Sequence, residues 1–279
     1  MRVPGWVASL SLARSARPVR LFAALGIAAA LSMGADVSAQ GQGRGGRAGG
    51  GAPASARVAA PQDLTGYFVS VVAEYWHLRM LVPAKGDFAM LPLNPAARDV
   101  ANAYDAAREK AAGTECSVYG APSIMRTPGR FYIHWADDNT LQLDIDSGTQ
   151  TRMFRFGGGP APAGEPAWQG ASVANWEGVG GGRGRAAGVV GAGGQLRVVT
   201  TGLRAGYLRR NGAPYSENAR LEEFFDSFTE PNGDRYLLVT SIVTDPKYLT
   251  DRYASTMNFK KIADRAGWDP TPCRADQAR

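Results

Sequence analysis

The stretch FYIHWADDNTLQLDIDSGTQTRMFRF, residues 131–156, decides the fold class that the sequence predicts. Apolar and polar side chains alternate along it with the two-residue period of a half-buried β-strand. The alternation is interrupted at residues 137–139 and 147–148, where polar residues and a glycine favour turns. We therefore predict three consecutive antiparallel strands joined by two tight turns.

The alternation also assigns each side chain to a face of the predicted strands. A three-residue turn at 137–139, with Asn139 in the left-handed conformation, keeps the two faces in register. It places three pairs of residues opposite one another: Trp135 and Leu141, His134 and Gln142, and Tyr132 and Asp144. With like faces matched across the second turn, Asp144 falls opposite Arg152. The polar face then looks either at solvent or into a partly polar barrel interior.

The remaining strand signals extend this meander into a larger sheet. Runs of β-branched and aromatic residues predict strands at 66–80, 171–178, 196–203, 219–230, 234–244 and 255–262. One helix is expected over 95–112, with Asn94 as its cap, Pro95 in its first turn and Gly113 after its end. One helix cannot cover so many strands, so the sheet closes on itself or packs as a sandwich. We predict a mainly β fold, an antiparallel lipocalin-like barrel with one outer helix.

The N-terminal residues have the pattern of an export signal. Four arginines precede the apolar stretch 21–35, and small residues at 37–39 suit a signal peptidase. The apolar stretch is shorter than the roughly 20 residues needed to span a bilayer, so we expect residues 1–39 to be a signal peptide cleaved after Ala39. We expect an exported protein of the periplasm or extracellular space, with no stable membrane anchor after cleavage.

Two Gly-rich segments flank and interrupt the predicted domain. Residues 40–61 are mostly glycine, arginine and small residues and predict a disordered leader. Residues 62–279 are expected to form a single β domain, interrupted by a flexible insertion at 179–194 that lacks the spacing of a phosphate loop. Signal removal lowers the formal net charge from +6 to +3, because four arginines and Asp36 leave. Export, and a leader without Phe or Tyr between its arginines, argue against a nucleic-acid partner.

The chain has two cysteines, Cys116 and Cys273. In a chain bound for an oxidising compartment, the simplest interpretation is one disulfide that ties the C-terminal tail to the body. Two separate buried thiols are the alternative. Because there is no CxxC motif and the histidines are His77 and His134, we expect no metal site and no cofactor.

A set of spaced motifs runs through the predicted domain. It consists of Cys116, Gly120, Pro122 and Met125 in C-x-x-x-G-x-P-x-x-M spacing, WQGASVANWEG at 168–178, LRVVTTG at 196–202, GAPYSENARLEEFF at 212–225 and IVTDPKYLT at 242–250. Together these motifs resemble a large family of exported bacterial proteins without an assigned activity. Its members carry W-x-G-x-S-x-x-x-W-E-G, L-V-V-x-T and D-P-x-x-[YL]-T motifs. The resemblance covers residues 62–273 and implies membership but no chemistry. Tyr215 takes the place where many members have histidine, so a role for that histidine does not transfer.

Few residues qualify as acid–base groups of an active site. Glu177 ends a strand, Tyr215 and Glu217 lie on a Gly-Pro turn expected at the barrel mouth, and His134 lies on the polar face. Solvated charge at a strand end is the simpler account of Glu177 and Glu217. The chain contains no GxSxG nucleophile elbow.

The aromatic residues supply a second kind of candidate. Most of them, Tyr67 included, are expected in the core, and a subset can line a ligand pocket. The ligand-binding candidates are Trp76, Tyr132, Asp144, Arg152 and Trp176. The scarcity of catalytic motifs favours an exported protein that binds a small apolar or amphipathic ligand in a barrel cavity. The alternative is a cofactor-independent extracytoplasmic lyase, isomerase or hydrolase with its acid and base at the cavity mouth. The sequence does not determine the identity of the ligand or the oligomeric state.

Overall fold

The computed structural model describes residues 54–159, 164–178 and 194–277. The predicted signal peptide 1–39 lies outside these residues, as do most of the predicted leader and all but Gly194 of the predicted insertion. Eleven strands are present in the described part, namely β1 (Gly66–Val71), β2 (Arg130–Asp137), β3 (Thr140–Ile145), β4 (Gln150–Arg155), β5 (Ala171–Gly178), β6 (Gly194–Thr201), β7 (Gly206–Tyr207), β8 (Pro214–Tyr215), β9 (Arg220–Thr229), β10 (Arg235–Thr244) and β11 (Tyr253–Ile262).

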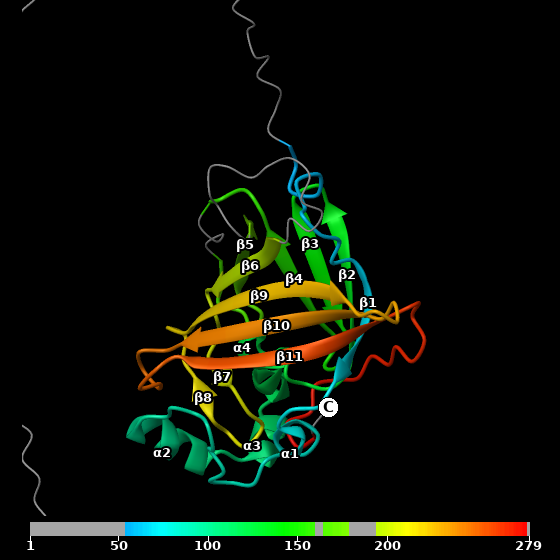
Figure 1. The fold of residues 1–279 in the computed structure, drawn as a ribbon. Coiled ribbons are helices and arrows are strands. Elements are labelled where there is room, and N and C mark those ends of the chain that lie inside the picture. The colour runs from blue at the N-terminus through cyan, green and yellow to red at the C-terminus, as the bar shows by residue number, and fades with distance from the viewer. Residues whose placement is uncertain (1–53, 160–163, 179–193, 278–279) are drawn as a thin grey trace, which may run out of the picture. The chain divides into compact units, whose positions relative to one another are not determined.

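Nine of these strands close into a barrel, in the order β1-β11-β10-β9-β6-β5-β4-β3-β2 (Figure 1). The predicted mainly β barrel is therefore confirmed. Neighbouring strands are antiparallel except β4 and β5, which run parallel over two residue pairs, Phe154 with Ser172 and Arg155 with Val173. The barrel strands β1–β4 meet the strands β5, β6, β9, β10 and β11 at this short parallel contact and at the antiparallel pair of β1 with β11. The strands β7 and β8 form a separate two-stranded sheet.

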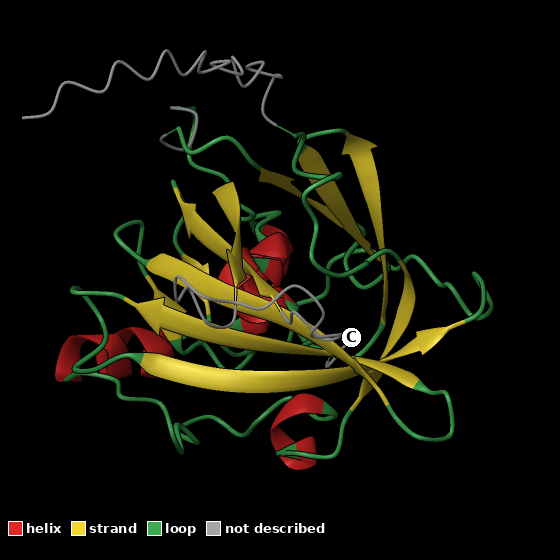
Figure 2. Cartoon of the chain, turned by 45° about the horizontal axis from the view of Figure 1, so that its top comes forward, coloured by secondary structure: helices red, strands yellow, loops and turns green. Residues whose placement is uncertain are grey.

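The helices of the described part are short and flank the barrel (Figure 2). They are α1 (Trp76–Arg79), α2 (Pro95–Ala103), α3 (Ala106–Ala111), the 3-10 helix η1 (Glu115–Tyr119) and α4 (Ala121–Ile124). The predicted cap of α2 is confirmed, because Asn94 Oδ1 accepts from Ala97 N at 2.9 Å. The predicted single helix divides at Tyr104, whose backbone is extended, and Asp105 caps α3. The strand predicted over 66–80 ends at Val71, and the chain turns into α1.

Across the first predicted turn of the opening stretch, the strand register is as predicted, but the turn that produces it is different. Trp135 pairs with Leu141, His134 with Gln142 and Tyr132 with Asp144, as predicted. The turn itself is two residues long, because Asp137 pairs with Thr140 and a bulge at Ala136 absorbs the extra residue. Asn139 does not adopt the predicted left-handed conformation.

The second turn shifts the register by one residue. Ile145 pairs with Gln150, so the loop is 146–149, with Gly148 at φ 72° and Thr149 at φ 50°. Asp144 therefore lies opposite Thr151, and Arg152 lies opposite Leu143. Because side chains alternate in strands, this one-residue shift moves Arg152 to the inner face. The predicted pairing of Asp144 with Arg152 is wrong, and the two side chains lie on opposite faces of the wall.

Side chains fill the barrel and close both of its ends. Inward apolar residues of the strands pack into one buried cluster, including Phe68, Phe131, Ile133, Leu143, Phe154, Phe225 and Phe259. At one end Trp135, Phe156 and Trp176 pack against this cluster, and Trp176 Nε1 donates to Ala56 O at 2.9 Å. Residues 54–61, predicted as disordered leader, thus cover this end. At the other end Val118 and Ile124, from η1 and α4, join the same cluster.

Candidate functional site

The four predicted acid–base residues lie in four different surroundings. Glu177 Oε1 is 3.4 Å from Arg197 Nη1 at the surface, and Glu217 Oε1 accepts from Lys247 Nζ at 3.2 Å. Tyr215 is fully buried instead of lying at a barrel mouth. Its turn packs under α2 and α4, and burial raises the pKa of its phenol. His134 is half-buried on the outer face of β2.

The five predicted ligand-binding residues divide into one pair and three separate positions. Tyr132 and Asp144 are cross-strand neighbours on the outer face. Arg152 points into the barrel, where Glu223 binds it. Trp176 belongs to the inner aromatic group beneath residue 56, and Trp76 lies on α1 with 59% of its surface exposed. The pair Tyr132–Asp144 is thus the part of the prediction around which a site can form.

The floor of a surface groove is a single row of side chains across four neighbouring strands. Tyr67 of β1 pairs with Tyr132 of β2, Tyr132 with Asp144 of β3, and Asp144 with Thr151 of β4. Directly opposed residues of antiparallel strands project to the same face, so all four side chains stand side by side on the outer wall. The row joins an aromatic half to a polar half.

The aromatic half is a stack of three rings. The ring centroids of Tyr67 and Tyr132 are 4.3 Å apart, and those of Tyr132 and His134 are 4.6 Å apart, with interplanar angles of 17° and 16°. Trp268 meets Tyr67 edge-on at 6.1 Å. Such contacts fix the ring orientations, so the aromatic surface is preformed.

The polar half is organised around the Asp144 carboxylate. Thr151 Oγ1 donates to Asp144 Oδ1 at 2.6 Å, and Gln142 Nε2 donates to both carboxylate oxygens at 2.9 and 3.0 Å. His134 Nδ1 is 3.8 Å from Asp144 Oδ2. These neighbours hold the carboxylate in one orientation, and its side chain keeps 26% of its surface exposed to accept from a ligand.

The facing wall of the groove is the C-terminal strap, which we define as residues 263–277. Arg265, Trp268 and Pro270 of the strap line the groove together with the row on the barrel. Arg265 lies over the Trp268 ring, with its guanidinium carbon 5.9 Å from the centroid. The open space between the two walls, which we call the strap groove, has a volume of about 310 Å³. This volume lies within the range of small-molecule sites.

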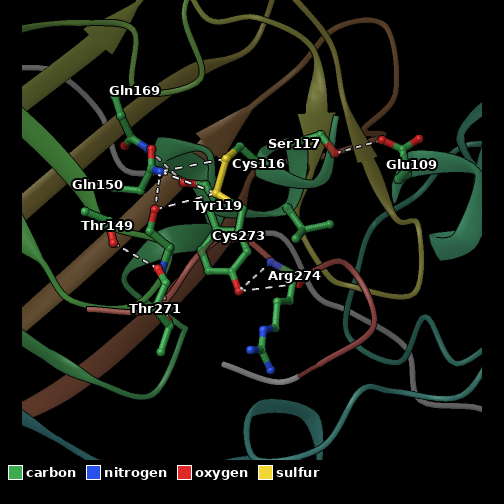
Figure 3. Close-up of a disulfide and its surroundings, with 12 residues drawn as sticks. Glu109, Cys116, Ser117, Tyr119, Thr149, Gln150, Gln169, Thr271, Cys273 and Arg274 are labelled. Carbon is green, nitrogen blue, oxygen red and sulfur yellow. Dashed lines mark hydrogen bonds between the residues drawn. A yellow bond between two sulfur atoms is a disulfide. The ribbon is translucent and has the colours of Figure 1, made fainter. Parts of the chain in front are cut away.

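The disulfide holds the strap against the barrel (Figure 3). Cys116 and Cys273 are bonded, as predicted, and join η1 to the strap across 157 residues of sequence. Thr149 Oγ1 donates to Thr271 O at 2.9 Å, and Thr271 N donates to Asp146 O at 3.0 Å. The same loop 146–149 that sets the register of β4 therefore anchors the strap, so the groove has one wall fixed by covalent and hydrogen bonds.

Sequence reasoning missed the residues that complete the groove. Tyr67 was expected in the core, but its side chain lies on the outer face of β1. Arg265 and Trp268 follow the last strand and carry no local signal that places them on β1 and β2. The disulfide prediction contained that information, because a bridge from Cys273 to Cys116 returns the tail to the barrel.

Comparisons with protein-family models, with curated proteins and with solved structures find no match for this chain. Within the described residues, no cluster of three or more histidine, cysteine, aspartate or glutamate side chains is arranged to hold a metal ion. The described helices include none with the length and apolar character needed to cross a bilayer.

Proposed function

We propose that this protein is exported and binds a small amphipathic ligand in the strap groove. The observation that carries the proposal is the row Tyr67–Tyr132–Asp144–Thr151, which places a fixed aromatic surface beside an oriented carboxylate. An apolar body with a few placed polar groups is the usual composition of small-molecule sites. The disulfide agrees with export, since such bonds persist mainly in oxidising compartments.

The ligand that suits this groove has a flat apolar part and a hydrogen-bond donor. The flat part packs against Tyr132 and Trp268, while a hydroxyl or amine donates to Asp144. Arg265, on the strap, supplies a cation at the rim. The site lies on the outer wall instead of the barrel lumen, because inward side chains fill the lumen of the described barrel.

Titration with N-phenyl-1-naphthylamine, a neutral amphipathic amine that fluoresces in apolar sites, tests the proposal. We expect saturable binding, weakened about tenfold or more by Trp268→Ala, because burying one aromatic side chain contributes roughly 1.5–3 kcal/mol. Asp144→Asn should weaken the probe less, since it removes a charge but keeps an acceptor. Trp76→Ala is the matched control, because it removes an exposed tryptophan from outside the groove. Absence of binding, or equal loss in Trp76→Ala and Trp268→Ala, contradicts the proposal.

Export has its own test. Expressed from the full chain, the mature protein should be recovered outside the cytoplasm with Gln40 as its first residue. N-terminal sequencing or intact mass of the secreted fraction measures this. A product that keeps residues 1–39 and stays in the cytoplasm contradicts the export part and leaves the groove proposal standing.

A further inference from the structure

Four arginines from three segments of the chain meet beside β11. Arg79 ends α1, Arg126 follows α4, and Arg209 and Arg210 lie between β7 and β8. Their side chains line a hollow of about 20 Å³, and we call them the arginine cluster. Arg79, Arg126 and Arg209 are only 3%, 8% and 5% exposed. Arginine is rarely buried to this extent unless its charge is paired.

The positive charges of the arginine cluster exceed the negative charges that face them. Arg79 has Glu74 as an ion-pair partner, and Arg210 donates to Thr127 Oγ1 at 3.2 Å. In the described part of the chain, neither Arg126 nor Arg209 forms an ion pair. Two buried guanidinium groups thus lack an ion-pair partner, and the charge of Asp87 acts on Arg209 without forming one.

The electrostatic interaction between the cluster's members follows from their burial. Burial lowers the pKa of Arg209, the phenol of Tyr253 opposes that change, and the like charge of Arg126 adds to it. Burial likewise lowers the pKa of Arg79, against the effect of Glu74 and in the same direction as the charge of Arg126. The cluster is therefore a site of positive potential that an anion would relieve.

The cluster also lacks hydrogen-bond acceptors. Five buried nitrogen atoms find no acceptor among the described residues: Arg79 Nη2, Arg126 Nη2, Arg209 Nε, Arg209 Nη1 and Arg210 Nε. A hollow of about 20 Å³ has room for roughly one water molecule. One water accepts about two hydrogen bonds, so hydration of the hollow leaves most of these donors unsatisfied.

A larger open groove shares Arg126 and Arg209 with the hollow. It has a volume of about 450 Å³, and Arg126 and Arg209 line it as they line the hollow. Its further lining includes Glu74, whose carboxylate is paired with Arg79, and Tyr253, Ser255 and Asn258 of β11. Tyr75 and Met90 also line the groove, and these are exposed side chains with large apolar surfaces. The groove is thus cationic at one wall and apolar at another, and it is too large for a bare ion alone.

We propose that this groove binds a small organic oxyanion, a carboxylate or a phosphate ester, with its charged group on Arg126 and Arg209. The guanidinium fork offers parallel N–H donors that match two oxygens of such a group, and an oxyanion supplies negative charge to a cluster with an excess of positive charge. The organic part packs against Tyr75 and Met90. None of the residues that line this groove lines the strap groove, so the inference stands independently of the proposed function.

Isothermal titration calorimetry at low salt tests the inference with phenyl phosphate, benzoate and inorganic phosphate. We expect at least one of the two aromatic anions to bind more tightly than inorganic phosphate, and Arg209→Gln to weaken it about tenfold or more. Arg204→Gln is the matched control, because it removes the same charge from a residue that lies over Trp168 and lines neither groove. Tighter binding of phenyl phosphate identifies a phosphate ester, and tighter binding of benzoate identifies a carboxylate.

A second variant keeps the test decisive if Arg209→Gln does not fold. Arg209→Lys retains the charge and loses the fork, so the preferred anion should bind more weakly while the melting temperature without anion stays near that of the wild type. The wild-type melting temperature should rise with anion concentration, since the anion binds the folded state. Failure of all three probes to bind, or equal weakening by Arg204→Gln and the Arg209 variants, overturns the inference.

Discussion

Arg152 of β4 and Glu223 of β9 form a two-fold hydrogen-bonded ion pair across the inside of the barrel. Arg152 Nη1 donates to Glu223 Oε1 at 3.0 Å and Nη2 donates to Oε2 at 2.5 Å, and both side chains are fully buried. Arg152 Nη2 also lies 3.3 Å from Thr200 Oγ1, which contacts Ser172 Oγ at 2.8 Å. The pair links β4 to β9 across the barrel interior, and through Thr200 it reaches Ser172, which pairs with Phe154 in the short parallel contact of β4 and β5.

Breaking this pair should destabilise the barrel strongly. Glu223→Gln leaves the Arg152 charge buried without a counter-charge, and we expect the free energy of unfolding to fall by about 3–5 kcal/mol. Urea unfolding followed by tryptophan fluorescence measures it. The double variant Arg152→Met with Glu223→Leu removes both charges and should recover most of the loss, because apolar packing replaces the pair. A cost below about 1 kcal/mol for Glu223→Gln would show that the pair adds little.

The sequence predicts the strands of this molecule better than it predicts the role of Arg152. Alternation is a local property, so it locates β2, β3 and β5 and the cap at Asn94. The face of Arg152 depends on the length of loop 146–149, in which Thr149 takes a left-handed conformation unusual for a β-branched residue. No local pattern signals that choice, so the inner ion pair was not predicted.

The disulfide should matter for stability and for ligand binding together. Replacing both Cys116 and Cys273 by serine opens a loop of 157 residues, and the chain-entropy model gives a loss of at most about 5 kcal/mol. Release of the strap also removes Trp268 from the groove, so N-phenyl-1-naphthylamine should bind at least tenfold more weakly. Reduced wild-type protein is the control for the substitutions themselves. Unchanged probe affinity in both samples would mean that the other strap contacts suffice.

The sequence predicts several components of the strap groove but not the groove itself. Tyr132 and Asp144 follow from the strand register, and the disulfide follows from the cysteine count. Their consequence, a strap that brings Trp268 to Tyr67, depends on contacts between residues about 200 positions apart in the chain. Such long-range contacts have no signal in the local sequence, so the groove can be identified only from the folded structure.

Protonation of Glu222 should account for part of the stability that the protein loses in acid. Burial opposes ionisation of this carboxyl, but hydrogen bonds from Arg220 and Arg197 outweigh it and lower its pKa. Because the pKa of this carboxyl is lower in the folded state, its ionisation adds to the free energy of unfolding at pH values above the unfolded pKa near 4.3. This contribution is lost as the pH falls through the folded-state pKa. Glu222→Gln should therefore cost about 1 kcal/mol at pH 7 and much less at pH 3. Urea midpoints at the two pH values measure this, and an equal cost at both would exclude an ionic cause.

Three tyrosines, Tyr104, Tyr207 and Tyr215, should resist ionisation in the folded protein. Burial and the charge of Glu109 raise the pKa of Tyr104 and Tyr207, and burial alone raises that of Tyr215. Because the pKa of each phenol is higher in the folded state, each adds to the free energy of unfolding at any pH below the unfolded pKa near 10. This contribution is lost as the pH rises through the folded-state pKa. At pH 11, absorbance at 295 nm should show these three of the ten tyrosines ionising only on unfolding. Glu109→Gln should lower the pKa of Tyr104 and Tyr207, but not that of Tyr215, and burial should still keep both values above about 10.

The hydroxyl of Tyr215 should explain why a glycine stands at position 120. This buried hydroxyl has no hydrogen-bond partner among the described residues, and a Cβ at Gly120 would lie 1.9 Å from it. Because no bond is lost, Tyr215→Phe should leave the free energy of unfolding within about 1 kcal/mol of the wild type or raise it. Gly120→Ala should cost about 1–3 kcal/mol through overpacking, and combining it with Tyr215→Phe should recover part of that cost. Thermal unfolding of the three variants measures this coupling. Strictly additive effects would mean that Gly120 is required for a reason other than the space that the Tyr215 hydroxyl occupies.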